Sequence, residues 1–324
     1  MQETLKKSKK NKQKLTKDRL RKIMLGSNEK DGLIKKVVLY SLLIVIGFIY
    51  IYPLLHMISN SFMTLEDLLD SSIHWLPAVP TVDNYRQAFN SMNYVNSLFQ
   101  SILIAGLPTL CNLISCSLIG YGLARYKFKA QNVIFALIIF SFILPSQATM
   151  IPTYVLYSNL GILGTLLSFI LPALLGMGYN SAIFILIFYQ FFKQIPQSLI
   201  EAALVDGSGH ARTYFRIAIP LSKPAIVTVL LFSFVWYWNN SYMTELYVAG
   251  VMKSSGWTSL VIQLKNFAAN FNSYATTSGA GVASLNESIN MAGTILTILP
   301  ILLVYLFFQK YFVESIDNAG ITGQ

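Results

Sequence analysis

The longest uncharged stretch of the sequence runs from residue 130 to residue 192, where no Asp, Glu, Lys or Arg occurs. A membrane-spanning helix needs about 20 consecutive apolar residues, so this stretch can hold two crossings. The rest of the chain agrees, because only 12% of its residues are charged and its mean hydropathy is +0.54. Soluble domains carry about 25% charged residues, which help to cover their surface. The composition therefore excludes ordinary soluble domains and predicts an integral membrane protein.

Six apolar segments bounded by charges or turn residues are long enough to cross a membrane. Helices are expected in them, because the bilayer interior offers the backbone no hydrogen-bond partner outside the segment. Alternating strands of about ten residues, the pattern of a membrane β-barrel, are absent from the sequence. We therefore predict an all-α membrane protein with six transmembrane helices. These helices cover residues 37–58, 98–124, 133–157, 166–192, 224–247 and 289–313.

The positive charge of the chain is gathered at its N-terminus. The net charge is +10, and residues 1–36 hold 13 Lys and Arg against 4 Asp and Glu. If the N-terminus is cytoplasmic, the inner segments hold 21 Lys and Arg and the outer segments hold 3. Positive residues mark the cytoplasmic side, so both termini are expected there. Residues 1–32 are expected to be a disordered arm on anionic lipid headgroups, with no role in binding nucleic acid.

Three further segments follow the basic tail. Residues 33–96 hold the first helix and an outer loop, residues 97–313 form the core of the membrane domain, and residues 314–324 form a cytoplasmic tail. The core contains a cytoplasmic loop, residues 193–223, whose sequence is not that of a simple linker.

The 193–223 loop has the pattern of two short helices joined by a turn. Pro196 suits the first position of a helix, and Gly207 can adopt the left-handed conformation that ends one. A second helix is expected to end at Pro220. Apolar residues are expected to share one side of each helix. They are Leu199, Ile200, Ala203 and Leu204 in the first, and Tyr214, Phe215 and Ala218 in the second.

The order of residues in this loop is similar to a known signature. Glu201-Ala202-Ala203, then Asp206-Gly207, then Ile219-Pro220 resembles the EAA loop of binding-protein-dependent ABC import permeases. Other motifs resemble the maltose-type, carbohydrate-importing branch of that family, and the resemblance covers residues 37–313. These motifs are Tyr52-Pro53-Leu54-Leu55, Tyr121-Gly122-Leu123-Ala124-Arg125-Tyr126, Trp236-Tyr237-Trp238-Asn239-Asn240 and Gln309-Lys310-Tyr311-Phe312-Val313. Asn240 and the long outer loop, residues 250–287, depart from the usual pattern.

The resemblance implies the transmembrane-domain fold of a type I ABC importer in a bacterial cytoplasmic membrane. Its partners would be a second permease subunit, two ATP-binding subunits and an extracytoplasmic solute-binding protein. The sequence has no phosphate-binding loop of the Gly-x-x-x-x-Gly-Lys-Ser/Thr type, so ATP and Mg²⁺ are expected on the partner ATPase and no cofactor on this chain. The chain itself is expected not to be an enzyme. The residues that would couple it to the ATPase are Glu201, Ala202, Ala203, Asp206, Gly207, Phe215 and Pro220.

Aromatic and amide side chains are the groups that bind sugars, because a sugar ring has apolar faces and a polar rim. In a membrane protein the same side chains also pack between helices or lie at the bilayer interface, and the sequence leaves both interpretations open. The candidate substrate-path residues are Gln147, Tyr179, Asn180, Trp236, Tyr237, Trp238, Asn239 and Asn240.

Other kinds of protein are considered against this interpretation. An ABC import permease for a peptide, an amino acid or phosphate is the main alternative. A secondary transporter would need an inverted repeat, broken helices and membrane-buried charges, and the six predicted helices indicate none of these. A membrane enzyme would need a catalytic cluster, and none is evident. The three histidines, His56, His74 and His210, lack the spacing of metal ligands, so no metal is expected. The two cysteines, Cys111 and Cys116, are five residues apart, which is a poor spacing for a disulfide within one helix.

Overall fold

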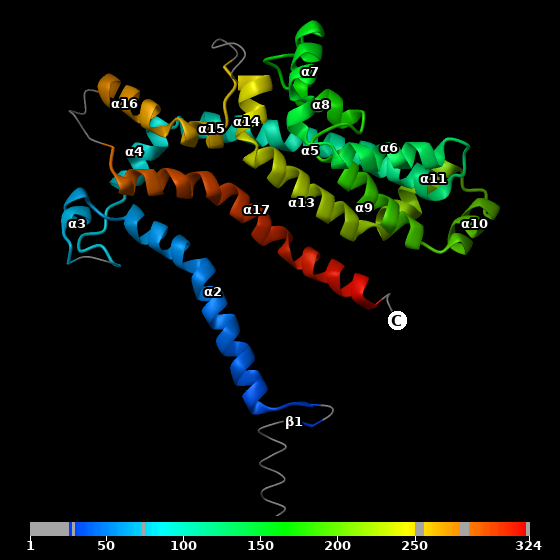
Figure 1. The fold of residues 1–324 in the computed structure, drawn as a ribbon, viewed down its shortest axis with the longest axis horizontal. Helices are drawn as coiled ribbons and strands as arrows, with labels where there is room; N and C mark the ends of the chain where they lie inside the picture. The colour runs from blue at the N-terminus through cyan, green and yellow to red at the C-terminus, as the bar shows by residue number, and fades with distance from the viewer. Residues whose placement is uncertain (1–25, 28–29, 73–74, 250–255, 279–284, 322–324) are drawn as a thin grey trace, which may run out of the picture. The chain divides into compact units, whose positions relative to one another are not determined.

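The computed structural model describes residues 26–27, 30–72, 75–249, 256–278 and 285–321 (Figure 1). Nearly all of the described regular structure is helical. The chain divides into two compact units, Met1–Pro80 and Thr81–Gln324, and each unit is described by itself.

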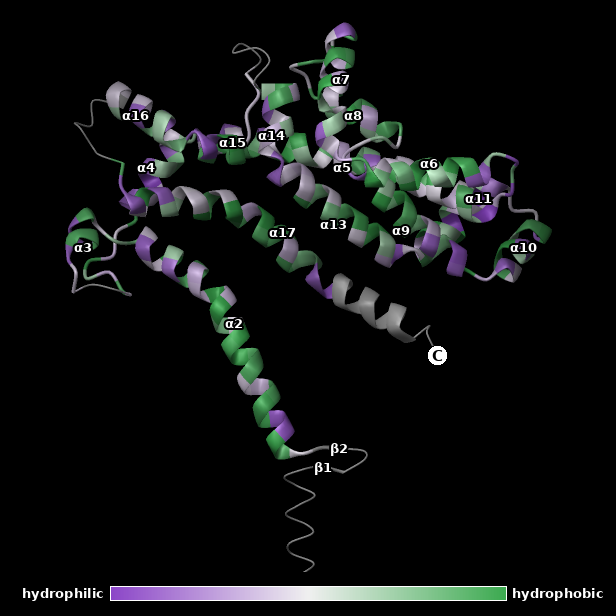
Figure 2. Cartoon of the chain, in the orientation of Figure 1, coloured by the Kyte–Doolittle hydropathy of each residue, from purple (hydrophilic) through white to green (hydrophobic). Residues whose placement is uncertain are grey.

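The first unit contains a short hairpin and one long apolar helix. Strands β1 (Gly26–Ser27) and β2 (Lys30–Asp31) pair antiparallel, and helix α2 (Leu33–Ser61) and the short helix α3 (Leu65–Leu69) follow. Figure 2 shows hydrophobic residues along most of α2. The most apolar window of α2 has 0% of its residues buried. So much exposed apolar surface is unfavourable in water, and it suits a helix that contacts lipid or another protein.

The second unit is a bundle of helices around α5 (Tyr94–Arg125), against which α8, α9 and α13 all pack. Helix α13 also packs against α17, and both run along the bundle in Figure 1. The other elements are α4 (Asp83–Ser91), α6 (Gln131–Ile143), α7 (Ser146–Asn159), α8 (Leu167–Leu174), α9 (Ser181–Gln194), α10 (Gln197–Val205), α11 (His210–Thr213), the π-helix η1 (Tyr214–Ala218), α12 (Ile219–Leu221), α13 (Lys223–Asn239), α14 (Ser241–Thr244), the π-helix η2 (Glu245–Ala249), α15 (Leu260–Lys265), α16 (Phe267–Ser278) and α17 (Glu287–Ile321).

A glycine allows α5 and α9 to approach closely. A Cβ atom at Gly120 would lie 2.7 Å from the Cβ of Phe188, so no larger residue fits without moving a helix. Small residues at such contacts are typical of helix packing in membranes. Two buried hydrophobic clusters result. One joins α5 and α9 to Tyr214 of η1, and the other encloses Tyr237 and Trp238 of α13.

Three of the six predicted helices are broken, which corrects the expectation of unbroken spans. The predicted helix 133–157 consists of α6 and α7, which meet at an angle of 102°. The break lies at Leu144, which is extended because Pro145 follows it. The predicted helix 166–192 consists of α8 and α9, and Gly176 between them has a φ of 72°. The predicted helix 224–247 is interrupted at Asn240, between α13 and α14.

The number of membrane crossings depends on how the bent helices are counted. Among the described residues, 3 helices are long and apolar enough to cross a membrane alone. Up to 6 spans result if each of three bent pairs is one span, and these pairs are α6 with α7, α9 with α10, and the segment His210–Leu221 with α13. The three single helices are α2, α5 and the part of α17 from Glu287 to Lys310. The chain is therefore a multi-pass membrane protein on length and composition.

Candidate functional site

The 193–223 loop begins with a sharp turn between α9 and α10, whose axes meet at 73°. Helix α9 ends at Gln194, and Ile195 is extended with φ −65° and ψ 127°. The residue before a proline avoids the helical region, so Pro196 explains why α9 cannot continue. Helix α10 then begins at Gln197. The local sequence alone accounts for this turn.

Gly207 ends α10 in the left-handed conformation, with a φ of 78°, as predicted. The N–H of Ser208 donates to the carbonyl of Ala203 at 2.9 Å, and the N–H of Gly207 donates to the carbonyl of Leu204 at 3.1 Å. These two bonds form a Schellman motif, which satisfies carbonyls at the end of the helix. Nothing lies within 4 Å of the position that a Cβ at Gly207 would occupy. Glycine is needed there for its conformation and not for lack of space.

Helix α10 leaves most of its surface exposed. Ile200, which is 6% exposed, and Ala203 are buried against the rest of the unit, as the predicted apolar side requires. Leu199 and Leu204 were expected on that side, but both are exposed. Only the two residues at the centre of the contact are covered, because the helix meets its neighbours over a narrow strip. The exposed residues therefore include Leu199, Glu201, Ala202, Leu204, Val205 (87%) and Asp206.

The second part of the loop is helical from His210 to Leu221, and it continues past the predicted end at Pro220. The N–H of Ile219 donates to the carbonyl of Tyr214, five residues earlier, which makes a wide π-turn. Pro220 has no N–H to donate, and it lies in the first turn of α12, after the wide turn, where none is required.

Tyr214 and Phe215 lie on different sides of this segment, contrary to the prediction. Tyr214 is buried and its hydroxyl lies 2.7 Å from the Ser117 hydroxyl of α5. Phe215 is 66% exposed. Consecutive residues of a helix point in different directions, so the Phe215 ring turns outward although its centroid lies only 4.9 Å from that of Tyr214. Phe215 is therefore available to a partner, as are Glu201 and Asp206.

Arg125, at the end of α5, joins this helix to the start of the loop. Its guanidinium donates to the carbonyl of Phe192, to the carbonyl of Ile195 at 2.6 Å, and to Oε1 of Gln197 at 3.2 Å. The side chain of Gln197 in turn donates to Glu201 at 3.2 Å. The sequence indicated Arg125 only as part of a motif, since nothing local shows which carbonyls it reaches.

The predicted substrate-path residues lie in different surroundings. Tyr237 and Trp238 are 3% and 4% exposed and belong to the hydrophobic core. Trp236 is partly buried and stacks on Phe184 and Phe232. The side chain of Asn240 caps α14 by accepting from the N–H of Met243 at 3.0 Å. Gln147 and Asn239 are exposed, while Tyr179 and Asn180 are partly buried at the break before α9.

A buried polar cluster, which the sequence did not reveal, surrounds that break. Asn112 of α5 donates to the hydroxyl of Ser233 at 3.4 Å and accepts from the hydroxyl of Ser181 at 2.9 Å. The Tyr237 hydroxyl accepts from the N–H of Tyr179 at 3.0 Å. Gly178 lies among these groups, because a Cβ there would be 2.8 Å from the Tyr237 oxygen. The cluster connects α5, α9 and α13, and each of its three hydrogen bonds joins residues at least 58 positions apart in the sequence.

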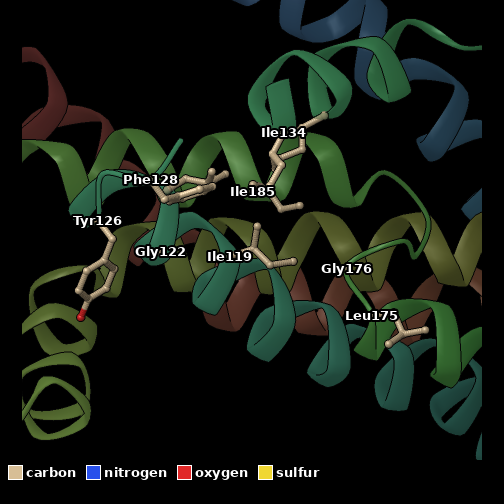
Figure 3. A pocket seen from close by; sticks show the side chains of 10 residues that line it. Ile119, Gly122, Tyr126, Phe128, Ile134, Leu175, Gly176 and Ile185 are labelled. Carbon is tan, nitrogen blue, oxygen red and sulfur yellow. The ribbon is translucent and has the colours of Figure 1, made fainter. Parts of the chain in front are cut away.

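A groove of about 600 Å³ lies on the surface between α5, α6 and α9. Figure 3 shows that its labelled residues, such as Ile119, Ile134 and Ile185, are apolar and that the hydroxyl of Tyr126 points away from them. A sugar needs hydrogen-bonding partners, so this groove does not have the chemistry of a sugar path. Its surface suits lipid or a neighbouring helix.

The histidines described by the structure pack against aromatic or amide groups. His56 lies near Asn60 and the ring of Trp75, and His210 lies edge-on to Tyr126. His74 lies outside the described residues. Cys111 and Cys116 are both free thiols.

Comparison with known proteins places this architecture in a family. Residues 117–318 match the family model of the binding-protein-dependent transport system inner membrane component. The chain belongs to this family. It is 30% identical to the polygalacturonan/rhamnogalacturonan transport system permease protein YtcP of Bacillus subtilis, over 89% of this chain and 98% of that protein. It is 27% identical to the arabinooligosaccharides transport system permease protein AraQ of the same organism, over 89% of this chain and 96% of that one.

A solved structure of this kind has the same fold. The crystal structure of a bacterial ABC transporter involved in the import of the acidic polysaccharide alginate includes a chain with a TM-score of 0.74 to this inner membrane component. The two chains are 23% identical, and the match covers 86% of this chain and 96% of that one. The chain with its broken helices therefore has the overall fold of that transporter chain, and its family membership decides against a secondary transporter.

Proposed function

We propose that this chain is the transmembrane permease subunit of an ATP-driven ABC importer for a carbohydrate, with an oligosaccharide as its cargo. The observation that carries the proposal is the exposed surface of α10. This helix follows directly after the turn that Arg125 of α5 holds to the end of α9. Membership of the family and the similarity to permeases named for polygalacturonan/rhamnogalacturonan and arabinooligosaccharides support a carbohydrate. The complete importer would contain a second permease subunit, two ATP-binding subunits and an extracytoplasmic solute-binding protein.

The orientation follows from the distribution of positive charge. With the six spans predicted from the sequence, four crossings precede the loop 193–223 and two follow it, so the loop and both termini would lie on one side of the membrane. Lys and Arg are concentrated in those segments, which assigns them to the cytoplasm of a bacterial cell. The ATPase is a cytoplasmic protein that binds ATP and Mg²⁺, and α10 would meet it directly.

The exposed groups of α10 suit a protein cleft. Leu199, Leu204 and Val205 offer apolar area, and Glu201 and Asp206 offer carboxylates at its rim. Ala202 allows the partner backbone to approach closely, since it adds only a methyl group. The exposed ring of Phe215 and the exposed Pro220 extend the surface along the second helix. Apolar residues with charges around them are typical of specific protein interfaces.

The cargo path would use the polar and aromatic side chains that remain accessible near the breaks. Tyr179, Asn180 and Asn240 are partly exposed, and Gln147 and Asn239 are exposed. The half-buried Trp236 completes this set. Tyr237 and Trp238 are packed in the core, and Tyr237 would hold the backbone of Tyr179 in place by accepting the hydrogen bond from its N–H.

Reconstitution tests this function. The chain is expressed with its partner permease, ATPase and solute-binding protein, purified as a complex, and placed in proteoliposomes. We expect uptake of a labelled oligosaccharide only when ATP is enclosed with the ATPase. Glu201→Lys is expected to reduce uptake to background while the chain still inserts, because it reverses the charge of α10. Gln194→Lys is the control, because it adds a positive charge to an exposed position outside α10. ATP-independent uptake, or normal uptake by Glu201→Lys, would contradict the proposal.

A further inference from the structure

Among the residues that the structure describes, Arg125 is the side chain of α5 that hydrogen-bonds to the turn between α9 and α10. Two of its acceptors are the carbonyls of Phe192 and Ile195, at the end of α9 and in the turn that follows. The third, Gln197, is the first residue of α10. One guanidinium thus holds the end of one helix, the turn and the start of the next helix.

The chemistry of this contact requires arginine. Guanidinium nitrogens are donors in a rigid, planar fork, so one side chain can serve several acceptors at fixed angles. The carbonyls at a helix C-terminus carry partial negative charge, which a cation stabilises. A lysine has a single ammonium on a flexible stem and could bond one or two of the three acceptors at a time.

The second half of the loop also contacts the inner part of α5. The hydroxyls of Tyr214 and Ser117 are 2.7 Å apart, and the rings of Tyr126 and His210 are 5.6 Å apart. The inner end of α5 therefore touches the loop on both sides of Gly207. The contact of Arg125 is directed at α10 itself, through Gln197, which also bonds Glu201 on the next turn of α10.

We propose that Arg125 is a positioning residue that fixes the coupling helix α10 to α5, so that a movement of α10 reaches α5 as well as α9. The inference rests on the proposed function, because it assumes that α10 is moved by the ATPase. Without Arg125, the turn at Pro196 and the buried side chains of Ile200 and Ala203 still hold α10, but its first turn is no longer fixed to α5 and the helix can pivot. ATP hydrolysis then continues, but each movement of the ATPase produces a smaller movement of the helices in the bundle.

The test compares Arg125→Gln, Arg125→Lys and Lys127→Gln in the complete importer. Lys127 is an exposed cation two residues further on, so its variant removes the same charge without touching the turn. The readout is sugar transported per ATP hydrolysed. We expect Arg125→Gln to lower this ratio about tenfold, as the loss of charge-assisted hydrogen bonds allows. Arg125→Lys should recover part of the ratio, and Lys127→Gln should keep it. An unchanged ratio in Arg125→Gln would overturn the proposal.

Hydrogen exchange separates positioning from a general structural role. In the purified complex, Arg125→Gln is expected to speed amide exchange in α10 by about tenfold and to leave α9 protected, because only the joint is loosened. Equal acceleration along α5 and α9 would show that the bundle itself is damaged, and it would overturn the proposal. This measurement needs no sugar. If the wild-type complex failed to transport any carbohydrate, the proposed function would fail while the exchange result still decided the role of Arg125.

Discussion

Gly207 and Gly178 are both essential to their surroundings in this structure, but for opposite reasons. Gly207 has a φ of 78° and open space around it, so its backbone conformation is what matters. Gly178 lies between Asn112, Tyr237 and Ala173, and a Cβ there would be 2.9 Å from the Cα of Ala173. The first glycine shapes an exposed loop, and the second lies where the buried polar cluster leaves no room for a side chain. The need for glycine at a helix end can therefore be explained from the local backbone conformation. The need for glycine at a packed break between helices is explained only by the side chains and backbone that surround it.

The largest effect is expected from Gly207→Pro. Proline requires a φ near −65°, which the turn cannot supply, and it removes the N–H that donates to Leu204. Transport in proteoliposomes should fall to background while the amount of inserted protein stays normal. Gly209→Ala is the matched control, because Gly209 has a φ of −69° and open space. Wild-type transport by Gly207→Pro would show that the turn does not set the position of α10.

Gly178→Ala should mainly reduce stability. The added methyl group forces apart the Asn112 side chain, the Tyr237 hydroxyl and the backbone of Ala173, which costs about 1–3 kcal/mol. Thermal unfolding in detergent measures the loss. Gly106→Ala in α5 is the control, because a Cβ there meets nothing within 4 Å and alanine favours a helix. Equal unfolding midpoints for Gly178→Ala and Gly106→Ala would show that Gly178 is not required for lack of space, which is the property that separates it from Gly207.

Tyr237→Phe tests whether the cluster supports the cargo path or forms part of it. The variant removes the acceptor of the Tyr179 N–H, and a lost hydrogen bond of this kind costs about 1 kcal/mol of stability. Because Tyr237 is buried, the KM for sugar should stay unchanged. Asn239→Ala, at an exposed position, should show the reverse: a raised KM and unchanged stability. A raised KM in Tyr237→Phe would place its hydroxyl in contact with the sugar.

The smallest effect is expected outside both regions, at the ion pair between Lys265 and Glu245. Both side chains are exposed, and surface ion pairs contribute about 0–1 kcal/mol. Lys265→Ala should therefore shift the unfolding midpoint less than Tyr237→Phe does, and high salt should make the two midpoints of Lys265→Ala and wild type converge. If Lys265→Ala lowered the unfolding midpoint more than Gly178→Ala does, surface contacts would stabilise this part of the unit more than the buried cluster does.

Local sequence predicted the loop better than it predicted the spans. Pro196 and Gly207 act on their own backbone, so the turn before α10 and its C-terminal end were both predictable. The breaks at Leu144 and Asn240 were not predicted, because a run of apolar residues indicates membrane without showing whether one helix or two fill it. Tyr214 and Phe215 are both apolar enough to predict one shared side, but only Tyr214 is buried in the structure.

The candidate path residues show the limit of residue type as a guide. Trp236, Tyr237 and Trp238 were chosen because aromatic rings bind sugars, and two of the three are packed in the core. The same rings stabilise helix packing, and only their neighbours distinguish the two uses. The role of all eight candidates in binding cargo stays a prediction, as does the role of the loop residues in binding the ATPase.

The sequence by itself determined that the chain is a membrane protein, that the loop 193–223 carries the family signature, and where that loop turns. Hydropathy, charge and backbone preference are properties of each residue and its near neighbours, so they can be read without the fold. The tertiary structure decided which side chains form hydrogen bonds between separate helices. Arg125 reaches the turn before α10, some 70 positions away along the chain, and Asn112 joins Ser181 and Ser233, because folding brings α5 beside α9 and α13. Such contacts arise only when separate helices pack, so no local pattern records them.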